Sequence, residues 1–237
     1  MEPDAGLEPV LESAYLDPAV VALRPDYRVL LMAVDGLGPG PGDDASEALL
    51  RAAEDAVRAR GEVPVEDLPH VAAWRDAYRA FGAKPQRTRH SLEALTRRAD
   101  AGLPRVNRLT DVYNAVSVLH QVPLGGEDLT AYVGPPRLVR ATGDEAFDTV
   151  TDGEEVVEHP EPGEVVWRDD AGVTCRRWNW RQCRRTRLRD ETTTALFIFD
   201  ALDPMTDPEL EAAADDLLGH LEAPGLRVAR RLVRHRP

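Results

Sequence analysis

Apolar and polar positions alternate along the first half of this chain with the period of an amphipathic helix. Apolar residues recur there every three or four positions, for example at Leu49, Leu50, Ala53 and Val57. Asp44 stands at the start of that run, where a capping residue is expected. The pattern predicts four helices, preceded by one buried strand. The helices span residues 44–60, 71–80, 91–101 and 106–120, and the strand spans residues 27–34.

The pattern changes in the second half, where short runs rich in Val, Thr, Trp and Phe are separated by glycine-bearing turns. The predicted elements are strands at residues 137–141, 164–168, 173–177 and 192–201, a helix at 206–221 and a last strand at 227–233. Helices first and strands later indicate a single α+β domain over residues 26–237, with a mixed or mostly antiparallel sheet packed with helices. Residues 1–25, with four prolines, are predicted to be an N-terminal extension carrying a short amphipathic element.

The predicted helix at residues 106–120 has an unusual polar face. Asn107, Asp111 and Asn114 fall on one side of it, with Ser117 at the edge. Asn and Asp each cost a helix interior roughly 0.5 kcal/mol relative to Ala, and a solvent-facing stripe is usually built from Lys, Glu, Arg or Gln. We therefore expect this face to hold a polar ligand. A solvated helix face with different caps is the alternative.

A glycine-rich segment, PLGGED at residues 123–128, follows this helix. If the chain reverses at Pro123, Glu127 comes to lie beside the polar stripe. Gly125 and Gly126 would let backbone amides approach a ligand closely. A tight turn explains the same two glycines equally well.

The net charge of −13 disfavours nucleic acid as a partner, but the basic residues are unevenly distributed. Residues 71–110 carry 9 bases and 3 acids, including a basic loop at 84–89, and residues 173–189 carry seven arginines and no acid. Charges are screened over about 8–10 Å, so local patches of this kind can bind RNA on an acidic protein.

The arginine-rich segment also contains two tryptophans. If TCRRWNWRQC is extended, its side chains alternate between two faces. We predict a pocket wall containing Asn179 and Arg181. We also predict an RNA-binding surface made of Arg176, Arg177, Trp178, Trp180, Arg184, Arg185 and Arg187. Each base stacked on an indole would contribute about 1–3 kcal/mol; packing of the indoles against helices is the alternative.

Other chemistries find little support in the sequence. Gly-x-Ser-x-Gly is absent, and the glycine-rich loop at residues 36–44 lacks the Lys-Ser/Thr of a phosphate loop. Cys175 and Cys183 have no histidines at ligand spacing, so we expect structural thiols, with neither a metal nor an organic cofactor. We expect a cytoplasmic protein that does not enter a membrane, because no apolar run approaches about 20 residues and the acidic N-terminus does not resemble a secretion signal.

These motifs resemble a known family. The frame Asn-x-x-x-Asp-x-x-Asn from Asn107 to Asn114, followed by Pro123 and by Asp128 before a leucine, is similar to the B3/B4 editing domain of the bacterial phenylalanyl-tRNA synthetase β subunit. Val122 stands where that family has Gln. The resemblance continues through residues 178–181 to about residue 202, in the form found in free-standing members, and covers about two thirds of the chain.

The resemblance implies a site that hydrolyses the ester between a wrong amino acid and the terminal ribose of a tRNA, without a metal. It also implies the same α+β fold. Asn114 matches a pocket asparagine of the family. Gly125 stands where the family has a histidine, and Gln182 is nearest to its pocket glutamate. These two departures point away from tyrosine, the amino acid that the synthetase domain removes.

We therefore predict a trans-editing aminoacyl-tRNA deacylase that acts on tRNA and does not aminoacylate by itself. The predicted catalytic residues are Asn114, Asp111 and Glu127. The predicted substrate-binding residues are Asn107, Ser117, Gly125, Gly126, Asn179, Arg181 and Gln182. The alternatives are a non-catalytic tRNA- or RNA-binding module of the same fold and a binding protein for a small, amino-acid-like molecule.

Overall fold

The computed structural model describes residues 6–38, 40–61, 63–221 and 223–234, and strand β2 (Arg28–Asp35) runs through its centre. The six inner residues of β2 are all apolar and buried. Because successive side chains of a strand point to opposite faces, the alternate positions Leu30 and Met32 join one apolar cluster, and Leu31 and Ala33 join another. A layer of structure therefore covers each face of β2.

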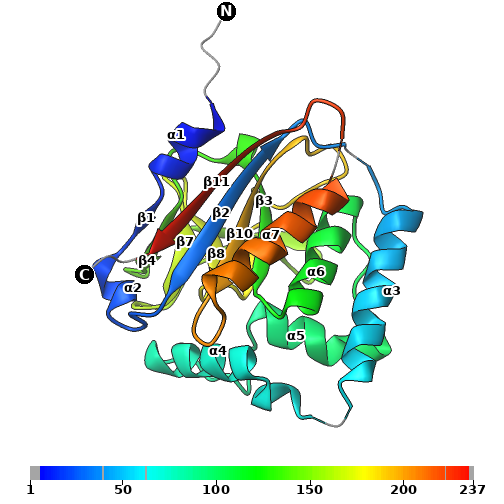
Figure 1. The fold of residues 1–237 in the computed structure, drawn as a ribbon. Coiled ribbons are helices and arrows are strands. Elements are labelled where there is room, and N and C mark those ends of the chain that lie inside the picture. Colours follow the sequence, from blue (N-terminus) through cyan, green and yellow to red (C-terminus); the bar gives the residue numbers. More distant parts are fainter. Residues whose placement is uncertain (1–5, 39, 62, 222, 235–237) are drawn as a thin grey trace, which may run out of the picture.

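The central sheet has the order β11-β2-β10-β3 and is antiparallel throughout. Its other strands are β11 (Arg227–Arg234), β10 (Thr194–Ala201) and β3 (Leu124–Asp128). One face is covered by three helices, α3 (Asp44–Ala59), α6 (Arg108–His120) and α7 (Asp207–Leu221) (Figure 1). The buried faces of these helices form one continuous apolar cluster with the sheet.

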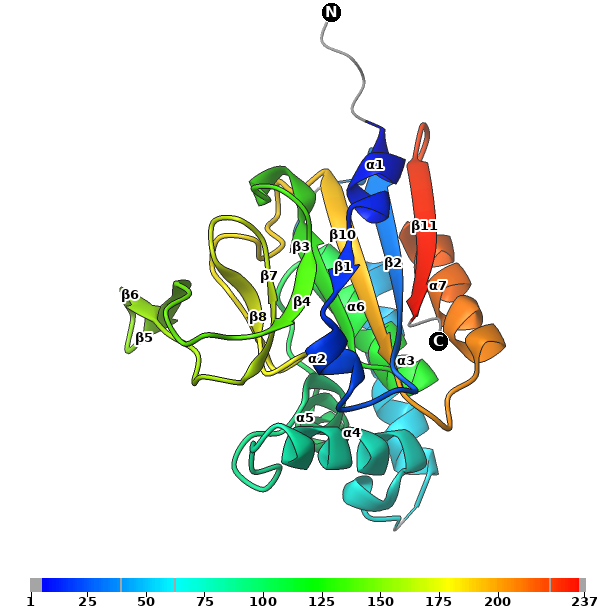
Figure 2. The same cartoon turned by 90° about the vertical axis from the view of Figure 1, so that its left-hand side faces the viewer.

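A second sheet, with the order β1-β4-β7-β8-β9, covers the opposite face (Figure 2). Its strands are β1 (Tyr15–Leu16), β4 (Arg137–Arg140), β7 (Val165–Arg168), β8 (Val173–Arg176) and β9 (Arg181–Gln182). Helices α4 (Pro69–Ala80) and α5 (Ser91–Arg98) lie at one end of the layers, and the hairpin β5 (Phe147–Thr151)–β6 (Glu154–Glu158) projects from the side. Short 3-10 helices, Val65–Asp67, Ala99–Ala101 and Leu129–Ala131, link these elements.

This architecture confirms the predicted α+β class with a mixed sheet. The predicted strand at residues 27–34 and helix at 71–80 begin within two residues of β2 and α4. Asp43 rather than Asp44 caps α3. The segment predicted as a turn at 123–128 is mostly strand β3, because it pairs with β10 as an edge strand.

The predicted N-terminal extension packs against the rest of the chain. Helix α1 (Leu7–Glu12) contributes Leu11 to the core, and α2 (Pro18–Val21) contributes Val20. Strand β1 pairs with β4 in parallel. The elements from residue 7 to residue 21 are therefore part of the same core as β2.

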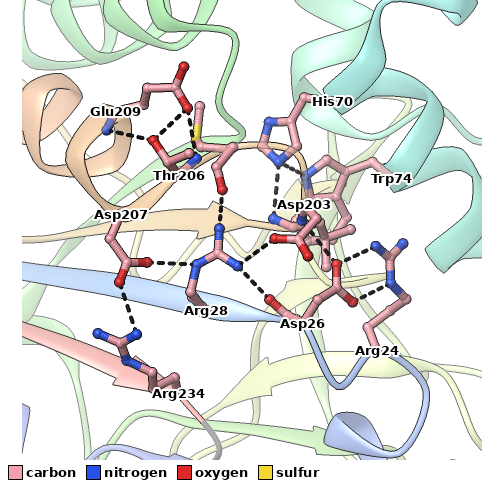
Figure 3. A network of polar contacts seen from close by, with 12 residues as sticks. Arg24, Asp26, Arg28, His70, Trp74, Asp203, Thr206, Asp207, Glu209 and Arg234 are labelled. Carbon is pink, nitrogen blue, oxygen red and sulfur yellow. Dashed lines mark hydrogen bonds and ion pairs between the residues drawn. The ribbon is translucent and has the colours of Figure 1, made fainter.

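A polar network joins the start of β2 to the loop after β10 (Figure 3). Arg28 forms ion pairs with Asp203 at 3.0 Å and Asp207 at 2.9 Å. His70 of α4 accepts a hydrogen bond from the backbone amide of Leu202 at 3.1 Å. The network holds α4, β2 and the start of α7 in one arrangement. Among the described residues, no helix is long and apolar enough to cross a membrane.

Candidate active site

A cavity of about 260 Å³ lies where α5 and α6 approach both sheets. Its walls combine aromatic rings, two carboxylates and two asparagine amides. The lining residues are Ser91, Ala94 and Leu95 of α5, Tyr113 and Asn114 of α6, Leu124, Gly125 and Glu127 of β3, Trp167 of β7, Cys175 of β8, Ile198 and Asp200 of β10, and Trp178, Asn179, Trp180, Arg181 and Gln182 after β8.

Glu127 is a fully buried carboxylate in this wall. Its Oε2 atom accepts a hydrogen bond from the hydroxyl of Tyr132, whereas Oε1 is buried without a partner among the described residues. Burial disfavours the charged form of a carboxylate and raises the pKa of Glu127 to about 7. Near neutral pH this side chain can therefore both give and take a proton.

Asp200 is a second buried carboxylate and lies on β10, an inner strand of the central sheet. It accepts hydrogen bonds from the Tyr27 hydroxyl at 2.6 Å and from Nδ2 of Asn179 at 3.3 Å. Burial, with a smaller contribution from the charge of Glu127, raises the pKa of Asp200 to about 7. The sequence analysis missed Asp200. An acid inside an otherwise apolar strand was the available indication.

Asn114 projects from α6 into the same cavity. Its side chain is buried, and it makes no hydrogen bond to any residue that the structure describes. Asn114 therefore has both donor and acceptor capacity left for a ligand. Gly125 and Gln182 also line the cavity, and Gln182 donates to the carbonyl of Gly126 at 2.9 Å.

Three other members of the predicted polar stripe have structural roles, which corrects the prediction for Asn107, Asp111 and Ser117. Asn107 precedes α6 and caps it by accepting a hydrogen bond from the Thr110 amide at 2.9 Å. The carboxylate of Asp111 accepts from the Val106 amide at 2.7 Å. Ser117 donates to a backbone carbonyl after the helix at 2.6 Å. None of the three lines the cavity, because the entry and exit of α6 use their polar atoms.

Gly126 is also outside the lining of the cavity, although it stands between two lining residues. A Cβ atom at this position would lie 2.7 Å from Cδ1 of Leu188 and 2.9 Å from Cδ1 of Tyr113. The absence of a side chain therefore lets β3 approach α6. This close packing replaces the substrate contact that we predicted for Gly126.

The arginine–tryptophan segment is a turn rather than a continuous strand. Strand β8 ends at Arg176, and φ is +47° at Arg177 and +68° at Trp178. Trp178 is fully buried, and its ring lies edge-on to Tyr27 and Trp74 at 5.0 and 5.3 Å. It packs in the core and does not present a surface for RNA. Trp180 lines the cavity, with the Arg177 guanidinium 4.4 Å from its ring centre.

Acids from distant segments neutralise most of the predicted RNA-binding arginines. The ion pairs are Arg176 with Glu164 and Glu158, Arg177 with Glu164, Arg181 with Glu158, Arg184 with Asp148 and Glu155, and Arg185 with Asp169. Arg176 is itself buried. Arg187, in contrast, is exposed. The segment has no acid in its own sequence, but acids of other segments lie beside it in the fold. The prediction of a free arginine surface is therefore corrected for Arg176, Arg177, Arg184 and Arg185. Arg181, which we predicted for the pocket wall, lines the cavity and is paired as well.

Cysteine and metal chemistry has little basis in this site. Cys175 and Cys183 are both free and buried, and burial raises the pKa of each thiol, to about 11 for Cys183. A protonated thiol is a poor nucleophile and a poor metal ligand. Within the described ranges, no group of three or more His, Cys, Asp or Glu side chains is placed to hold a metal ion.

The fold and the cavity define an α+β protein that encloses two acidic side chains and a free amide beside aromatic rings. Residues 73–211, more than half of the chain, match the B3/4 domain, so this protein belongs to the B3/4 domain family. A similar solved structure is an N-terminal fragment of the phenylalanyl-tRNA synthetase beta-subunit from Pyrococcus horikoshii, with 13% identity and a TM-score of 0.46. The match covers 91% of this chain and 50% of that chain, so the present chain spans half of that fragment. No curated protein matches the sequence significantly.

Proposed function

We propose that this protein is a trans-editing deacylase, which hydrolyses the ester that joins a wrong amino acid to a tRNA. Membership of the B3/4 domain family supports this class of substrate. The observation that carries the reaction is the Glu127 carboxylate, which lines the cavity with one oxygen unpartnered and has a pKa of about 7. This is the range in which a general base works best near neutral pH.

In the proposed reaction, Glu127 accepts a proton from a water molecule as its oxygen attacks the ester carbonyl carbon. The Asn114 amide donates a hydrogen bond to the oxyanion that develops on the carbonyl oxygen. The tetrahedral intermediate then collapses, and the ribose oxygen leaves with the proton that Glu127 returns. The pair of Asp200 and Asn179, joined at 3.3 Å, is positioned in the wall to hold the substrate ammonium. An aminoacyl ester is already activated, so orientation and these contacts suffice.

The test is deacylation of a panel of correctly and wrongly charged tRNAs by the wild-type protein and by Asn114→Ala. We expect selective hydrolysis of one mischarged species. We expect the rate in the variant to fall by about 100-fold or more, as for the loss of an oxyanion donor. Full activity in the variant would contradict the role of Asn114, and no hydrolysis by the wild type across a complete panel would contradict the function.

Asn107→Ala is the matched control, because it removes the same kind of side chain from the N-cap of the same helix, outside the cavity. The loss of this cap is expected to lower stability by about 1 kcal/mol. Turnover at a temperature well below unfolding is expected to stay close to that of the wild type.

A second candidate is a binding protein for a small, amino-acid-like molecule. The ion pairs of Arg176, Arg181 and Arg185 favour it, because they leave fewer cations for a polyanion. Calorimetric titration with free amino acids separates the two functions. Tight binding of a free amino acid without hydrolysis of any charged tRNA would support the small-molecule binding protein.

A further inference from the structure

The loop between α4 and α5 carries exposed cations that the proposed reaction does not use. Lys84, the single lysine of the chain, is exposed, as are Arg87 and Arg89. Among the described residues, Lys84 and Arg87 have no ion-pair or hydrogen-bond partner for their side chains, and Arg89 approaches Glu93 only at 3.8 Å. This basic loop, residues 84–89, therefore differs from the paired arginines after β8.

The basic loop is held in one shape. Its backbone closes on itself, because the amides of Arg87 and Thr88 both donate to the carbonyl of Lys84 at 2.9 Å. Pro85 and Thr88 are buried between the exposed cations. Arg177 donates from Nη1 to the Thr88 hydroxyl at 2.5 Å, which anchors the loop to the turn after β8. A ligand that binds here pays little entropy to order the backbone.

The same anchor connects the basic loop to the cavity. Arg177 stacks on Trp180, and Trp180 lines the cavity. The loop then continues into α5, whose first residue, Ser91, also lines the cavity and donates its amide to the carbonyl of Asn179 at 2.9 Å. The exposed cations therefore lie a few residues from the cavity wall, on the side of Trp180.

A groove of about 250 Å³ runs along the basic loop. Lys84, Arg87 and Arg177 line it, together with the aromatic ring of Phe81. Two acids also line it: Glu164 is engaged by Arg176, and Glu161 is exposed. The cations outnumber the free acid, so the groove favours an anion that can also contact an aromatic ring.

We infer that the basic loop contacts the phosphodiester backbone of the RNA whose 3′ end enters the cavity. This inference rests on the proposed function and names the surface that delivers the substrate. Lys and Arg contacts with phosphates position a nucleic acid without reading its sequence. The loop thus takes the role that the sequence analysis gave to the arginines after β8.

The test uses a double variant that carries both Lys84→Gln and Arg87→Gln. Its affinity for uncharged tRNA is compared with that of the wild type by fluorescence anisotropy at several salt concentrations. Two lost phosphate contacts are expected to weaken binding about ten-fold at low salt and to reduce the slope of log K against log salt by about 1.5. The matched control is a second double variant, Arg51→Gln and Arg58→Gln together, which removes the same amount of charge from exposed positions on α3. It is expected to change the affinity less than about two-fold.

The inference is overturned if the double variant binds tRNA with the affinity and salt slope of the wild type, or if the wild type does not bind tRNA. Thermal unfolding of the variant should match the wild type, because neither side chain has a partner to lose. Hydrolysis of an aminoacyl ester of adenosine, which carries no phosphate, separates this inference from the proposed function. The double variant should hydrolyse that ester like the wild type. If neither protein hydrolyses any ester while only the variant loses tRNA, the deacylase proposal fails and the RNA contact stands.

Discussion

Glu127 and Asp200 are two carboxylates whose titration depends on each other. Each has a pKa of about 7 because it is buried, and the charge of Glu127 raises the pKa of Asp200. At neutral pH the cavity therefore holds less negative charge than two exposed acids would carry.

Substitution of Glu127 tests this arrangement at the level of one residue. The wild-type deacylation rate is expected to rise with pH through about 7, because Glu127 acts as a base only when it has lost its proton. Glu127→Gln should lower kcat/KM by about 100-fold or more and remove the rise. The measurement is a pH–rate profile of both proteins. Folding should survive, because Gln retains an acceptor for the Tyr132 hydroxyl. A variant that keeps the rise would assign it to another group.

The residues of the site divide clearly into those that the sequence could and could not reveal. The sequence predicted Asn114 and Glu127 because amides and acids are unusual on a helix face and in a glycine-rich segment, and both line the candidate cavity. Asp111 resembled them in sequence, but its carboxylate binds a backbone amide at the start of α6. Only the geometry of the helix entry distinguishes such a residue from a ligand-binding one.

At the scale of elements, His70 of α4 joins its own helix to the residue after α6 and to the loop after β10. Its Nδ1 atom lies 2.7 Å from the carbonyl of Gln121 after α6, and Nε2 accepts from Trp74 of α4 and from Leu202 after β10. Nε2 is thus an acceptor and Nδ1 a donor, so the ring is neutral. Burial lowers the pKa of His70 to about 4 from an ordinary value of 6.5.

This histidine makes stability depend on pH. As the pH falls below about 6.5, His70 of the unfolded chain binds a proton, whereas His70 of the folded chain stays neutral until about pH 4. The free energy of unfolding therefore decreases as the pH falls through this range. His70 alone should reduce the free energy of unfolding by about 2 kcal/mol between pH 7.5 and pH 5. His70→Gln should be less stable at pH 7.5 but should lack this share of the decrease. Urea unfolding at the two pH values measures it, and an equal decrease in both proteins would contradict the assignment.

The close approach of β3 to α6 gives a second prediction at this scale. Gly126→Ala would place a Cβ atom against Leu188 and Tyr113, and such overpacking costs about 1–3 kcal/mol. Gly219→Ala on the exposed side of α7 is the control, because nothing lies within 4 Å of the added atom. This change should raise stability by about 0.5–1 kcal/mol through helix propensity. The midpoints of urea unfolding measure the stability of both variants. Unchanged stability in Gly126→Ala would show that β3 shifts away from α6 without cost, which would contradict the prediction.

Helices and long strands were predictable because their apolar periodicity is local. The hairpin β5–β6 was missed, although its turn contains Asp152-Gly153, both with positive φ. This dipeptide favours tight hairpins, but the flanking strands are too polar to stand out. The turn after β8 could not be foreseen, because tertiary packing of Trp178 imposes the positive φ there.

At the scale of the whole molecule, charge is arranged so that segments far apart in sequence neutralise each other. The hairpin β5–β6 and its neighbours supply acids to the arginines after β8, among them Glu158 to Arg176 and Arg181. A count of charges within a sequence window cannot reveal such pairs. The fold class depends on patterns along the chain and was predictable. The proposed RNA surface, in contrast, depends on which cations stay unpaired after folding.

The aromatic wall of the cavity has an optical consequence. The chain has four tryptophans, and three of them, Trp167, Trp178 and Trp180, line the cavity. The fourth, Trp74, lies 5.3 Å from Trp178, ring centre to ring centre. All four tryptophan side chains therefore lie in the cavity wall or next to a residue of that wall. We therefore expect a ligand that enters the cavity to change the intrinsic tryptophan fluorescence of this protein, so that binding can be followed without a label.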